Sequence, residues 1–494
     1  MEIRFVDTTL RDGSQSLWAW GLGTGMMEAV ADDMDQAGFD VIEAPVLGLF
    51  AKKFVRDLRE DFWEMARMLA RQMPRTPKSA MLGNYILPFE LSTPRAIVEL
   101  YHKCLVDIGV LQRAQTTCNT LDQIDGPFEW VIPMFRDLGL QVVIALSYTI
   151  SPRHTDEHYA QKTRDALRFK PDAIYLKDQG GLLTVDRLRT LLPVIMQNAE
   201  SVPVELHSHC TTGLAGLVYL EALRLGVTTL HTAVPPLANG SGQPSVLNVA
   251  RNGAIIGYRS AIDEGRIRRI AKRLTSFAKQ DDLPLGVPLE YDESQYIHQV
   301  PGGVISNLRF QLAELGMQHR LDEVLEEAVR VRHDLGYPIM ITPHSQYVVT
   351  QAAINVAVGS RYELVIDELI LFAKGFYGED SGYGWMDQNL KDRILGSRRA
   401  SEISNRKNPE IPLTRIREQL GGASISDEEL LLRYIMKGTQ EIAKMRAAGP
   451  PRQYRDVTSP LAELIRRLQD SSGVCYVQVR RGDTSVVVRK APAI

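Results

Sequence analysis

The sequence predicts an α/β fold: a closed (β/α)8 barrel of the TIM type, followed by a mostly helical domain and a small α+β tail. Short, mostly apolar runs alternate with longer amphipathic stretches from residue 1 to about residue 285. Such alternation requires parallel strands joined by helical crossovers. Eight repeats of this unit fill about the length of one barrel domain. Beyond residue 285 the alternation ends, which predicts a different architecture there.

The eight expected strands are short runs rich in Val, Ile, Leu and Phe. They lie at residues 3–6, 39–42, 80–82, 110–111, 142–146, 173–176, 204–206 and 228–230. Helical periodicity lies between them, at residues 26–36, 96–108, 161–169, 185–198 and 214–225. We assign residues 1–285 to the barrel. A doubly wound open sheet is the structural alternative, because it is built from the same units.

Amphipathic helical patterns dominate the next segment, which we assign to a second domain at residues 286–448. They lie at residues 305–317, 320–334, 344–358, 362–372, 413–420 and, as one charged helix, 427–447. The run Gly449-Pro450-Pro451 ends this pattern. Residues 449–494 form the tail, with a helix at 461–469 and strands at 474–479 and 484–488. The turn residues at 481–483 predict that these strands form a β-hairpin.

Composition excludes several classes of protein. The formal net charge of −3 gives no electrostatic reason to expect nucleic acid as a partner. No apolar run reaches 18 residues, which argues against a transmembrane span. The N-terminus lacks the pattern of a signal peptide, and the four cysteines are scattered. We therefore expect a cytoplasmic protein with reduced thiols.

Polar residues follow the first and seventh expected strands. Asp7, Arg11, Asp12 and Gln15 come directly after the first strand, although a solvated loop explains such a cluster equally well. His207-Ser208-His209 ends the seventh strand. Because strand side chains alternate between faces, the two histidines point the same way and can bind one ion. A hydrogen-bonded histidine pair is the alternative.

Lys177 follows the sixth expected strand and faces the same rim of the barrel. A lysine buried at a barrel mouth has a lowered pKa, because burial disfavours the charged form. A neutral amine can add carbon dioxide to form a carbamate, an oxygen ligand for a metal ion. A salt bridge to Asp178 or to a substrate acid is the simpler alternative.

Six segments occur in order along the chain. They read DTTLRDGSQSL at 7–17, SYTISPRHT at 147–155, KDQGGLL at 177–183, HSHCTTGLA at 207–215, HQVPGGVISNL at 298–308 and ITPHSQYV at 341–348. Together they resemble the carboxyltransferase domain of biotin-dependent enzymes, a group within the DRE-TIM metallolyases. That group includes pyruvate carboxylase, the α subunit of oxaloacetate decarboxylase and the metal-binding subunit of transcarboxylase.

The resemblance implies a divalent metal ion (zinc, manganese or cobalt) bound by Asp12, His207, His209 and a carbamylated Lys177. It implies a metal-dependent carboxyltransferase that moves a carboxyl group between carboxybiotin and a keto-acid-like or carbonyl acceptor through an enolate. In reverse, the same site decarboxylates a β-keto acid such as oxaloacetate.

Five further residues match functional positions of the family. Arg11 and Gln15 match residues that hold the α-keto acid and its enolate oxygen. Thr342 matches the residue that moves a proton between biotin N1 and the substrate carbon. Ser345 and Gln346 fall where the family contacts biotin. The family's second domain forms a funnel over the barrel mouth, so a funnel-like second domain is expected here.

The substrate pocket departs from the family pattern. The family has a substrate-binding arginine after its third strand, where this chain has Met81-Leu82-Gly83-Asn84. The family's Asp-Thr-Ala after the eighth strand becomes His231-Thr232-Ala233. Loss of a carboxylate-binding arginine predicts that the acceptor differs from pyruvate.

The resemblance also predicts the partners. The expected biotin-bearing motif, a lysine between methionines, is absent, since Met436-Lys437-Gly438 does not match it. The biotin carboxyl carrier protein and the biotin carboxylase are therefore expected as separate chains, and similar domains suggest a homodimer. The competing functions are a biotin-independent aldolase or lyase of the same superfamily and a non-catalytic scaffold subunit of a carboxylase complex.

Overall fold

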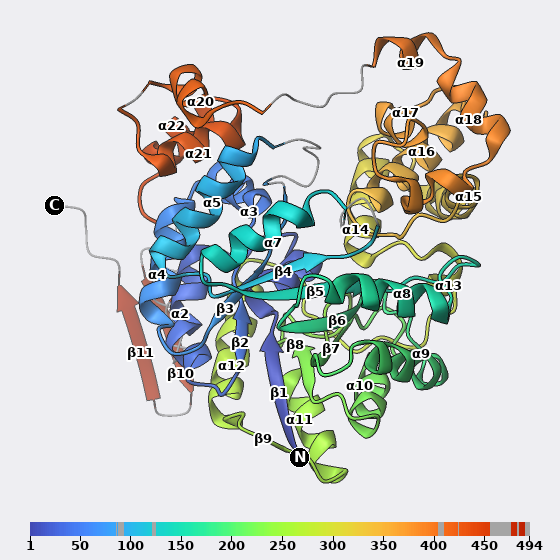
Figure 1. Ribbon diagram of the computed structural model, residues 1–494. Coiled ribbons are helices and arrows are strands. Elements are labelled where there is room, and N and C mark those ends of the chain that lie inside the picture. Colours follow the sequence, from blue (N-terminus) through green and yellow to red (C-terminus); the bar gives the residue numbers. More distant parts are fainter. Residues whose placement is uncertain are drawn as a thin grey trace.

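The structure is a computed structural model that describes residues 1–84, 86, 93–120, 125–403, 410–422, 424–454, 476–481 and 484–489. Among these residues, eight parallel strands close into a barrel (Figure 1). The strands are β1 (Glu2–Asp7), β2 (Val41–Glu43), β3 (Lys78–Met81), β4 (Arg113–Thr117), β5 (Gln141–Ser147), β6 (Ala173–Asp178), β7 (Val204–Ser208) and β8 (Thr229–Thr232). The pairing of β1 with both β2 and β8 closes the sheet, which confirms the predicted barrel and excludes the open sheet.

Amphipathic helices surround this barrel, as the alternating pattern predicts. They are α1 (Ser14–Trp18), α2 (Thr24–Asp35), α3 (Gly48–Lys53), α4 (Phe62–Gln72), α5 (Arg95–Ile108), α7 (Phe128–Asp137), α8 (Asp156–Leu167), α9 (Val185–Asn198), α10 (Ala215–Arg224), α11 (Val246–Ile255) and α12 (Glu264–Gln280). Their apolar faces and the outward faces of the strands form one large core. A short strand, β9 (Arg259–Ser260), extends the sheet beside β1.

The prediction for the fourth strand is wrong. Val110 and Leu111 are buried, but they precede the strand, which begins at Arg113. Its sequence Arg-Ala-Gln-Thr-Thr lacks the apolar signal of a buried strand. Gln115 faces the barrel interior, where it accepts a hydrogen bond from Tyr175 Oη and donates one to Ser79 Oγ. The interior of the barrel is polar at this level, so apolar periodicity could not identify β4.

A second group of helices has a separate apolar core. It contains α13 (Ser294–His298), α14 (Gly302–Glu314), α15 (Leu321–Asp334), α16 (His344–Val358), α17 (Asp367–Ala373), α18 (Gln388–Leu395) and α19 (Arg398–Glu402). The expected helix at 362–372 is wrong in its first turn. Tyr362 has a left-handed backbone (φ 58°) and donates its N–H to Asn355 Oδ1, so the helix begins only at Asp367.

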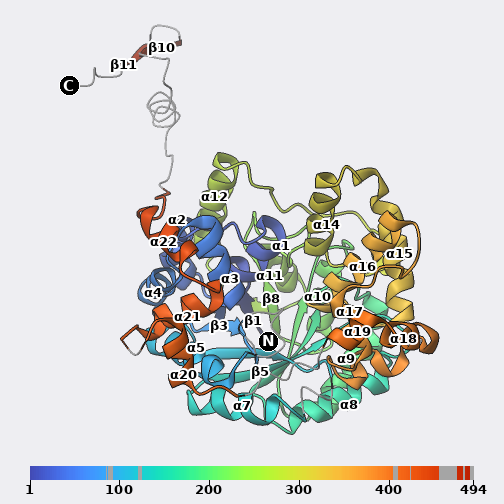
Figure 2. The ribbon, with the colours of Figure 1, turned by 90° about the horizontal axis from the view of Figure 1, so that it is seen from above.

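The helices α20 (Leu413–Leu420), α21 (Asp427–Met436) and α22 (Gln440–Ala447) pack against the barrel core instead. Figures 1 and 2 show them on the side of the barrel opposite to α14–α19. The single helix predicted at 427–447 is wrong. Lys437 and Gly438 both have positive φ angles, of 54° and 158°, and these angles end α21 and separate it from α22.

The tail forms the predicted hairpin. Strands β10 (Tyr476–Arg481) and β11 (Thr484–Arg489) pair antiparallel. The expected helix at 461–469 and two of the expected turn residues lie outside the described residues. The boundaries predicted at residues 285 and 448 stay predictions. No helix in the described part of the chain is long and apolar enough to cross a membrane.

Side chains of the second helical group clamp the loop that follows β5. Gln299 accepts hydrogen bonds from Thr149 Oγ1 and Ile150 N and donates one to Ile150 O. Arg332 Nη2 donates to Thr149 Oγ1 at 3.0 Å and to Ile150 O at 3.1 Å. This loop, at the carboxyl end of the strands, therefore connects the barrel to the helices that carry Thr342.

Candidate metal centre and active site

The expected metal ligands Asp12, His207 and His209 lie together at the carboxyl end of the barrel. Asp12 belongs to the π-helical turn η1 (Thr9–Gly13), which follows β1, whereas His207 lies in the last two residues of β7 and His209 follows this strand. The Nε2 atoms of His207 and His209 lie 3.3 and 3.7 Å from Asp12 Oδ2. One ligand atom from each residue lies within 4.8 Å of the others, and all three are buried. This set of atoms suits a divalent ion such as zinc.

Hydrogen bonds within the first loop orient Asp12. Asp7 accepts hydrogen bonds from the Thr9 hydroxyl and backbone N–H, at 2.5 and 3.1 Å, and so shapes the turn. Ser16 Oγ donates to Asp12 Oδ1, which leaves Oδ2 facing the histidines. Burial opposes ionisation of Asp12, but Arg11 and the histidines hold its pKa well below 3.8. Burial raises the pKa of Asp7 to about 8, so Asp7 acts in the turn and not in the cluster.

The imidazole of His209 is held with its Nε2 lone pair facing the cluster. His209 Nδ1 lies 2.5 Å from Ser241 O, which can only accept, so Nδ1 carries the proton. The Gln243 amide nitrogen lies 3.0 Å from His209 Nε2 and 3.2 Å from His207 Nε2. Thr8 Oγ1 donates to the Gln243 oxygen and fixes the amide. One N–H group thus faces both lone pairs, which shows that the two lone pairs converge on one point, as a shared metal ion requires.

His207 has a second partner on its other nitrogen. Its Nδ1 lies 3.2 Å from His231 Nδ1, and His231 Nε2 lies 3.0 Å from Glu205 Oε2. Burial lowers the pKa of His207 well below 6.5, so the ring is neutral and can bind a metal. Sequence reasoning did not identify Gln243 or the pairing of His231 with Glu205. The change from Asp to His at 231 was the available signal.

Lys177 lies on β6 directly beside His207 of β7 in the strand register. It is buried, and burial together with the nearby Arg11 lowers its pKa from 10.5 to about 8. The direction of this shift agrees with the expectation for a lysine at the barrel mouth. A substantial fraction of the amine is therefore neutral at physiological pH.

Arg11 lies between two buried carboxylates. Its Nε and Nη2 lie 2.9 and 2.6 Å from Glu43 Oε2, and its Nη2 lies 3.1 Å from Asp12 Oδ2. Burial opposes the charge of Arg11, but Asp12 and Glu43 raise its pKa above 12.5. Gln15 Oε1 is 3.5 Å from Arg11 Nη1, at the edge of hydrogen bonding. The guanidinium therefore stays charged beside the candidate metal ligands.

The expected proton-transfer residue lies in the second helical group. Thr342 precedes α16, and its Oγ1 accepts a hydrogen bond from Gln346 Nε2 at 2.9 Å. Gln346 Oε1 in turn accepts from Ser345 Oγ at 3.1 Å. Ser345 is buried and Gln346 half-buried, so Gln346 is the more accessible of the two expected biotin contacts.

The fold and the cluster define a (β/α)8-barrel protein with a candidate divalent-metal centre at the carboxyl ends of its strands. Residues 296–488 match a family model described as a conserved carboxylase domain. The chain is 33% identical over 383 residues to a pyruvate carboxylase subunit from Methanocaldococcus jannaschii, covering 76% of this chain and 66% of that protein. It is 34% identical over 396 residues to the protein of the same name from Methanothermobacter thermautotrophicus, covering 80% and 68%.

Solved structures agree with the fold. The carboxyl transferase domain of Rhizobium etli pyruvate carboxylase, determined with pyruvate and biocytin, matches with a TM-score of 0.78. The two share 20% sequence identity over 91% of this chain and 78% of that chain. The chain belongs to the carboxyltransferases of biotin-dependent carboxylases and is an enzyme of that class. It spans about two thirds of the length of the two archaeal relatives.

Proposed function

We propose that this chain transfers a carboxyl group between carboxybiotin, carried on a separate protein, and a small carbonyl acceptor. The observation that carries the proposal is the convergence of Asp12, His207 and His209 beside the charged Arg11. Within a carboxyltransferase family, such a cluster at the carboxyl end of a barrel is a site for chemistry rather than for stability.

Lys177, which lies beside His207 in the strand register, is the proposed fourth member of the ligand set. Lys177 Nζ, when neutral, adds to carbon dioxide: a nitrogen–carbon bond forms, one proton leaves to solvent, and the amine becomes a carbamate anion. We propose that this carbamate joins Asp12, His207 and His209 as a ligand. A divalent ion bound there supplies Lewis-acid polarisation of the acceptor's carbonyl oxygen.

Thr342 moves the proton. Because its Oγ1 accepts from Gln346, its own proton is free to be donated to the ureido nitrogen of biotin as the bond from that nitrogen to the carboxyl carbon breaks. The same oxygen takes a proton from the acceptor carbon that becomes the nucleophile. One proton passes from the acceptor to biotin, and one carboxyl group passes the other way. Arg11 stabilises the negative oxygen of the enolate that forms between these steps.

The acceptor belongs to the keto-acid-like or carbonyl compounds. The archaeal relatives are named for pyruvate, which is therefore the first compound to test. The segment after β3 carries Leu82-Gly83-Asn84 and offers no guanidinium for a carboxylate. We propose that a neutral carbonyl or amide compound is accepted better than pyruvate.

The partners follow from the same family. We propose that the biotin carboxylase and the biotin carboxyl carrier are separate chains, since the two relatives are named as subunits of a carboxylase. Carrier binding is expected beside Gln346. The homodimer also stays a proposal, and sedimentation of the purified chain would test it.

Biotin-stimulated decarboxylation tests the function and separates it from the biotin-independent lyase. The chain, supplied with Co²⁺, is incubated with a panel of β-keto acids that includes oxaloacetate, with and without free biotin. Biotin is expected to accelerate release of carbon dioxide. Thr342→Ala should lower the biotin-stimulated rate of carbon dioxide release about a hundredfold or more, whereas Thr342→Ser should keep this rate.

Thr350→Ala is the matched control, because Thr350 is exposed on α16, the helix that Thr342 precedes. It should behave as the native chain. Cleavage that is equally fast without biotin, and unaffected by Thr342→Ala, would establish the lyase and overturn the proposed function.

A further inference from the structure

A column of polar side chains crosses the barrel interior beneath the metal ligands. Arg113 Nη2 lies 2.5 Å from Glu205 Oε2, which lies 3.0 Å from His231 Nε2. His231 Nδ1 lies 3.2 Å from Nδ1 of the ligand His207. All four side chains are buried. Barrel interiors are usually filled by branched apolar side chains, so this column needs an explanation.

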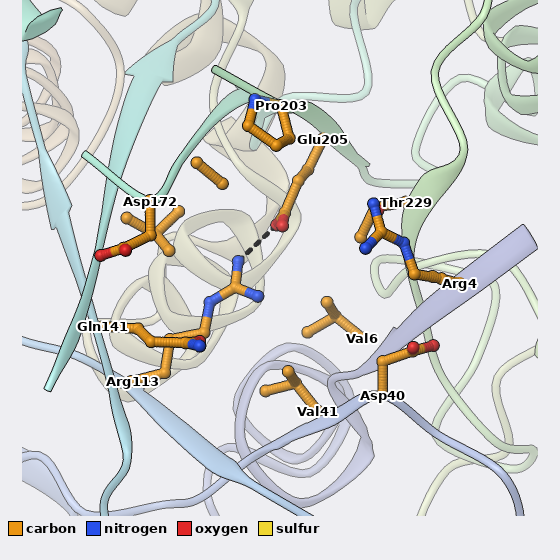
Figure 3. A pocket seen from close by; sticks show the side chains of 12 residues that line it. Arg4, Val6, Asp40, Val41, Arg113, Gln141, Asp172, Pro203, Glu205 and Thr229 are labelled. Carbon is orange, nitrogen blue, oxygen red and sulfur yellow. Dashed lines mark hydrogen bonds and ion pairs between the residues drawn. The ribbon is translucent and has the colours of Figure 1, made fainter. Parts of the chain in front are cut away.

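The column begins at the amino-terminal end of the barrel. Figure 3 shows the ion pair of Arg113 and Glu205 at a cavity of about 220 Å³, whose lining also includes Arg4, Asp40 and Asp172. The guanidinium of Arg113 can only donate and faces this carboxylate at 2.5 Å, so Glu205 is the acceptor at the base of the column.

The direction of each hydrogen bond follows from Glu205. A carboxylate can only accept, so His231 Nε2 carries a proton. In neutral His231 the other nitrogen, Nδ1, is then an acceptor, and His207 Nδ1 must donate to it. His207 Nε2 is left with a lone pair, which faces Asp12 and His209. The column thus selects the tautomer of His207 that can bind a metal.

The ring of His231 is also fixed in place. Tyr175 stacks on it, with ring centroids 5.0 Å apart and planes at 22°. Tyr219 Oη donates to the His231 backbone oxygen at 2.6 Å. The stack with Tyr175 and the backbone hydrogen bond from Tyr219 hold His231 in place. The orientation of His207 is therefore set by its hydrogen bond to His231.

The geometry points to His231 and Glu205 as positioning residues of the metal centre: they hold His207 in the tautomer and orientation that bind the ion. This inference rests on the metal site of the proposed function and concerns only how that site is built. It also explains why this chain has His231 where the family has an aspartate, because Glu205 supplies a carboxylate that pairs with His231.

Co²⁺ affinity of the metal-free chain, measured by competition with a chelator and by the visible spectrum of bound Co²⁺, tests the inference without any substrate. His231→Leu removes the acceptor for His207 and should weaken binding by about 10- to 100-fold. His231→Asn keeps an acceptor oxygen near the position of Nδ1 and should recover affinity to within about tenfold of native. In Glu205→Gln the amide can donate as well as accept, so His231 and His207 can adopt the opposite tautomers. Co²⁺ binding should therefore weaken as well.

Tyr175→Phe is the matched control, because it removes the buried hydrogen bond to Gln115 in the same layer and keeps the stack on His231. It should lower the melting temperature without changing Co²⁺ affinity. If His231→Leu does not fold, the Asn and Gln variants decide. Affinities within twofold of native in all folded variants overturn the inference, as does a native chain that binds no Co²⁺. Tight Co²⁺ binding without carboxyl transfer contradicts the proposed function and leaves this inference standing.

Discussion

Individual atoms decide the chemistry of this site. Asp12 presents one oxygen to Ser16 and the other to the histidines. His209 presents one nitrogen to Ser241 and the other to the cluster. Each ligand thus has a partner that orients it, which is the arrangement that tunes metal sites in general. Lys177 differs from these residues because its chemistry depends on losing a proton.

Carbamate formation at Lys177 should follow its lowered pKa of about 8. Only the neutral amine reacts, so at constant dissolved carbon dioxide the rate should rise about tenfold per pH unit below pH 8 and level off above it. Carbon-13 NMR of the chain supplied with zinc, which is diamagnetic, and with labelled carbon dioxide measures the carbamate signal between pH 6 and 9.

Lys177→Gln should remove that signal, and Lys162→Arg should keep it. Lys162 is a suitable control because it is also buried but is paired with Asp380. A rate that still rises tenfold between pH 8 and pH 9, as for an exposed lysine, would contradict the assignment.

Some of these residues are readable from the sequence and others are not. The spacing of His207 and His209 on a strand is a local signal, and Lys177 follows its strand in the same way. Asp12 competes with Asp7 in the sequence, and only the resemblance distinguished them. Gln243 and Glu205 carry no local signature, because their roles arise from contacts between strands or loops distant along the chain.

Among the elements, the predicted strands and helices were confirmed where one face of the element is apolar. The prediction of a strand failed where the interior of the barrel is polar. Strand β4 was missed for that reason, since Gln115 takes an interior place that an apolar residue usually fills. The break between α21 and α22 was missed because Lys437 has a left-handed backbone that its side chain does not predict. The helix α16 matched its expected bounds, since its end is marked by Gly359 at φ 77°.

A buried histidine on helix α5 makes the stability of the barrel depend on pH. His102 on α5 is buried, its Nδ1 lies 2.6 Å from Val98 O, and its ring packs edge-on to Phe135. Burial lowers its pKa from 6.5 to about 4. The unfolded chain therefore binds more protons below pH 6.5, and stability is lost as pH falls from 6.5 towards 4.

This residue alone should cost about 2 kcal/mol between pH 7 and pH 5. In His102→Gln the unfolding free energy should fall less steeply over that range, as followed by circular dichroism in urea at each pH. His333→Gln removes an exposed histidine and should keep the native slope. Equal slopes in the native chain and His102→Gln would show that His102 does not carry this dependence.

For the whole molecule, the decisive contact lies between the barrel and the second helical group. The proposed metal ligands come from the barrel, whereas the proposed proton-transfer residue Thr342 comes from the second helical group, so the proposed reaction needs both in fixed relation. Gln299 and Arg332 provide that relation through the loop after β5. Arg332 is 5% exposed, and burial lowers its pKa to about 10 while leaving it charged at neutral pH.

Arg332→Leu should loosen this contact at a cost on the order of 3 kcal/mol, because it removes charged hydrogen bonds and leaves buried acceptors without a donor. Calorimetry should show the helical group melting before the barrel. Carboxyl transfer should fall while Co²⁺ affinity stays native. Glu326→Gln on the same helix removes an exposed ion pair and should change stability by less than about 0.5 kcal/mol. A single unchanged transition in Arg332→Leu would contradict the role of the clamp.

The polar column inside the barrel constrains how this enzyme can change over time. Removing one partner of a buried ion pair costs about 3–5 kcal/mol, whereas exchanging both partners together can be nearly neutral. Arg113, Glu205 and His231 therefore form an epistatic unit: a single substitution that leaves a buried charge unpaired is costly, whereas compensated pairs are permitted. Variant libraries that diversify these positions one at a time are expected to yield few folded, metal-binding descendants beyond close mimics such as His231→Asn, and libraries that vary the positions jointly are expected to yield more.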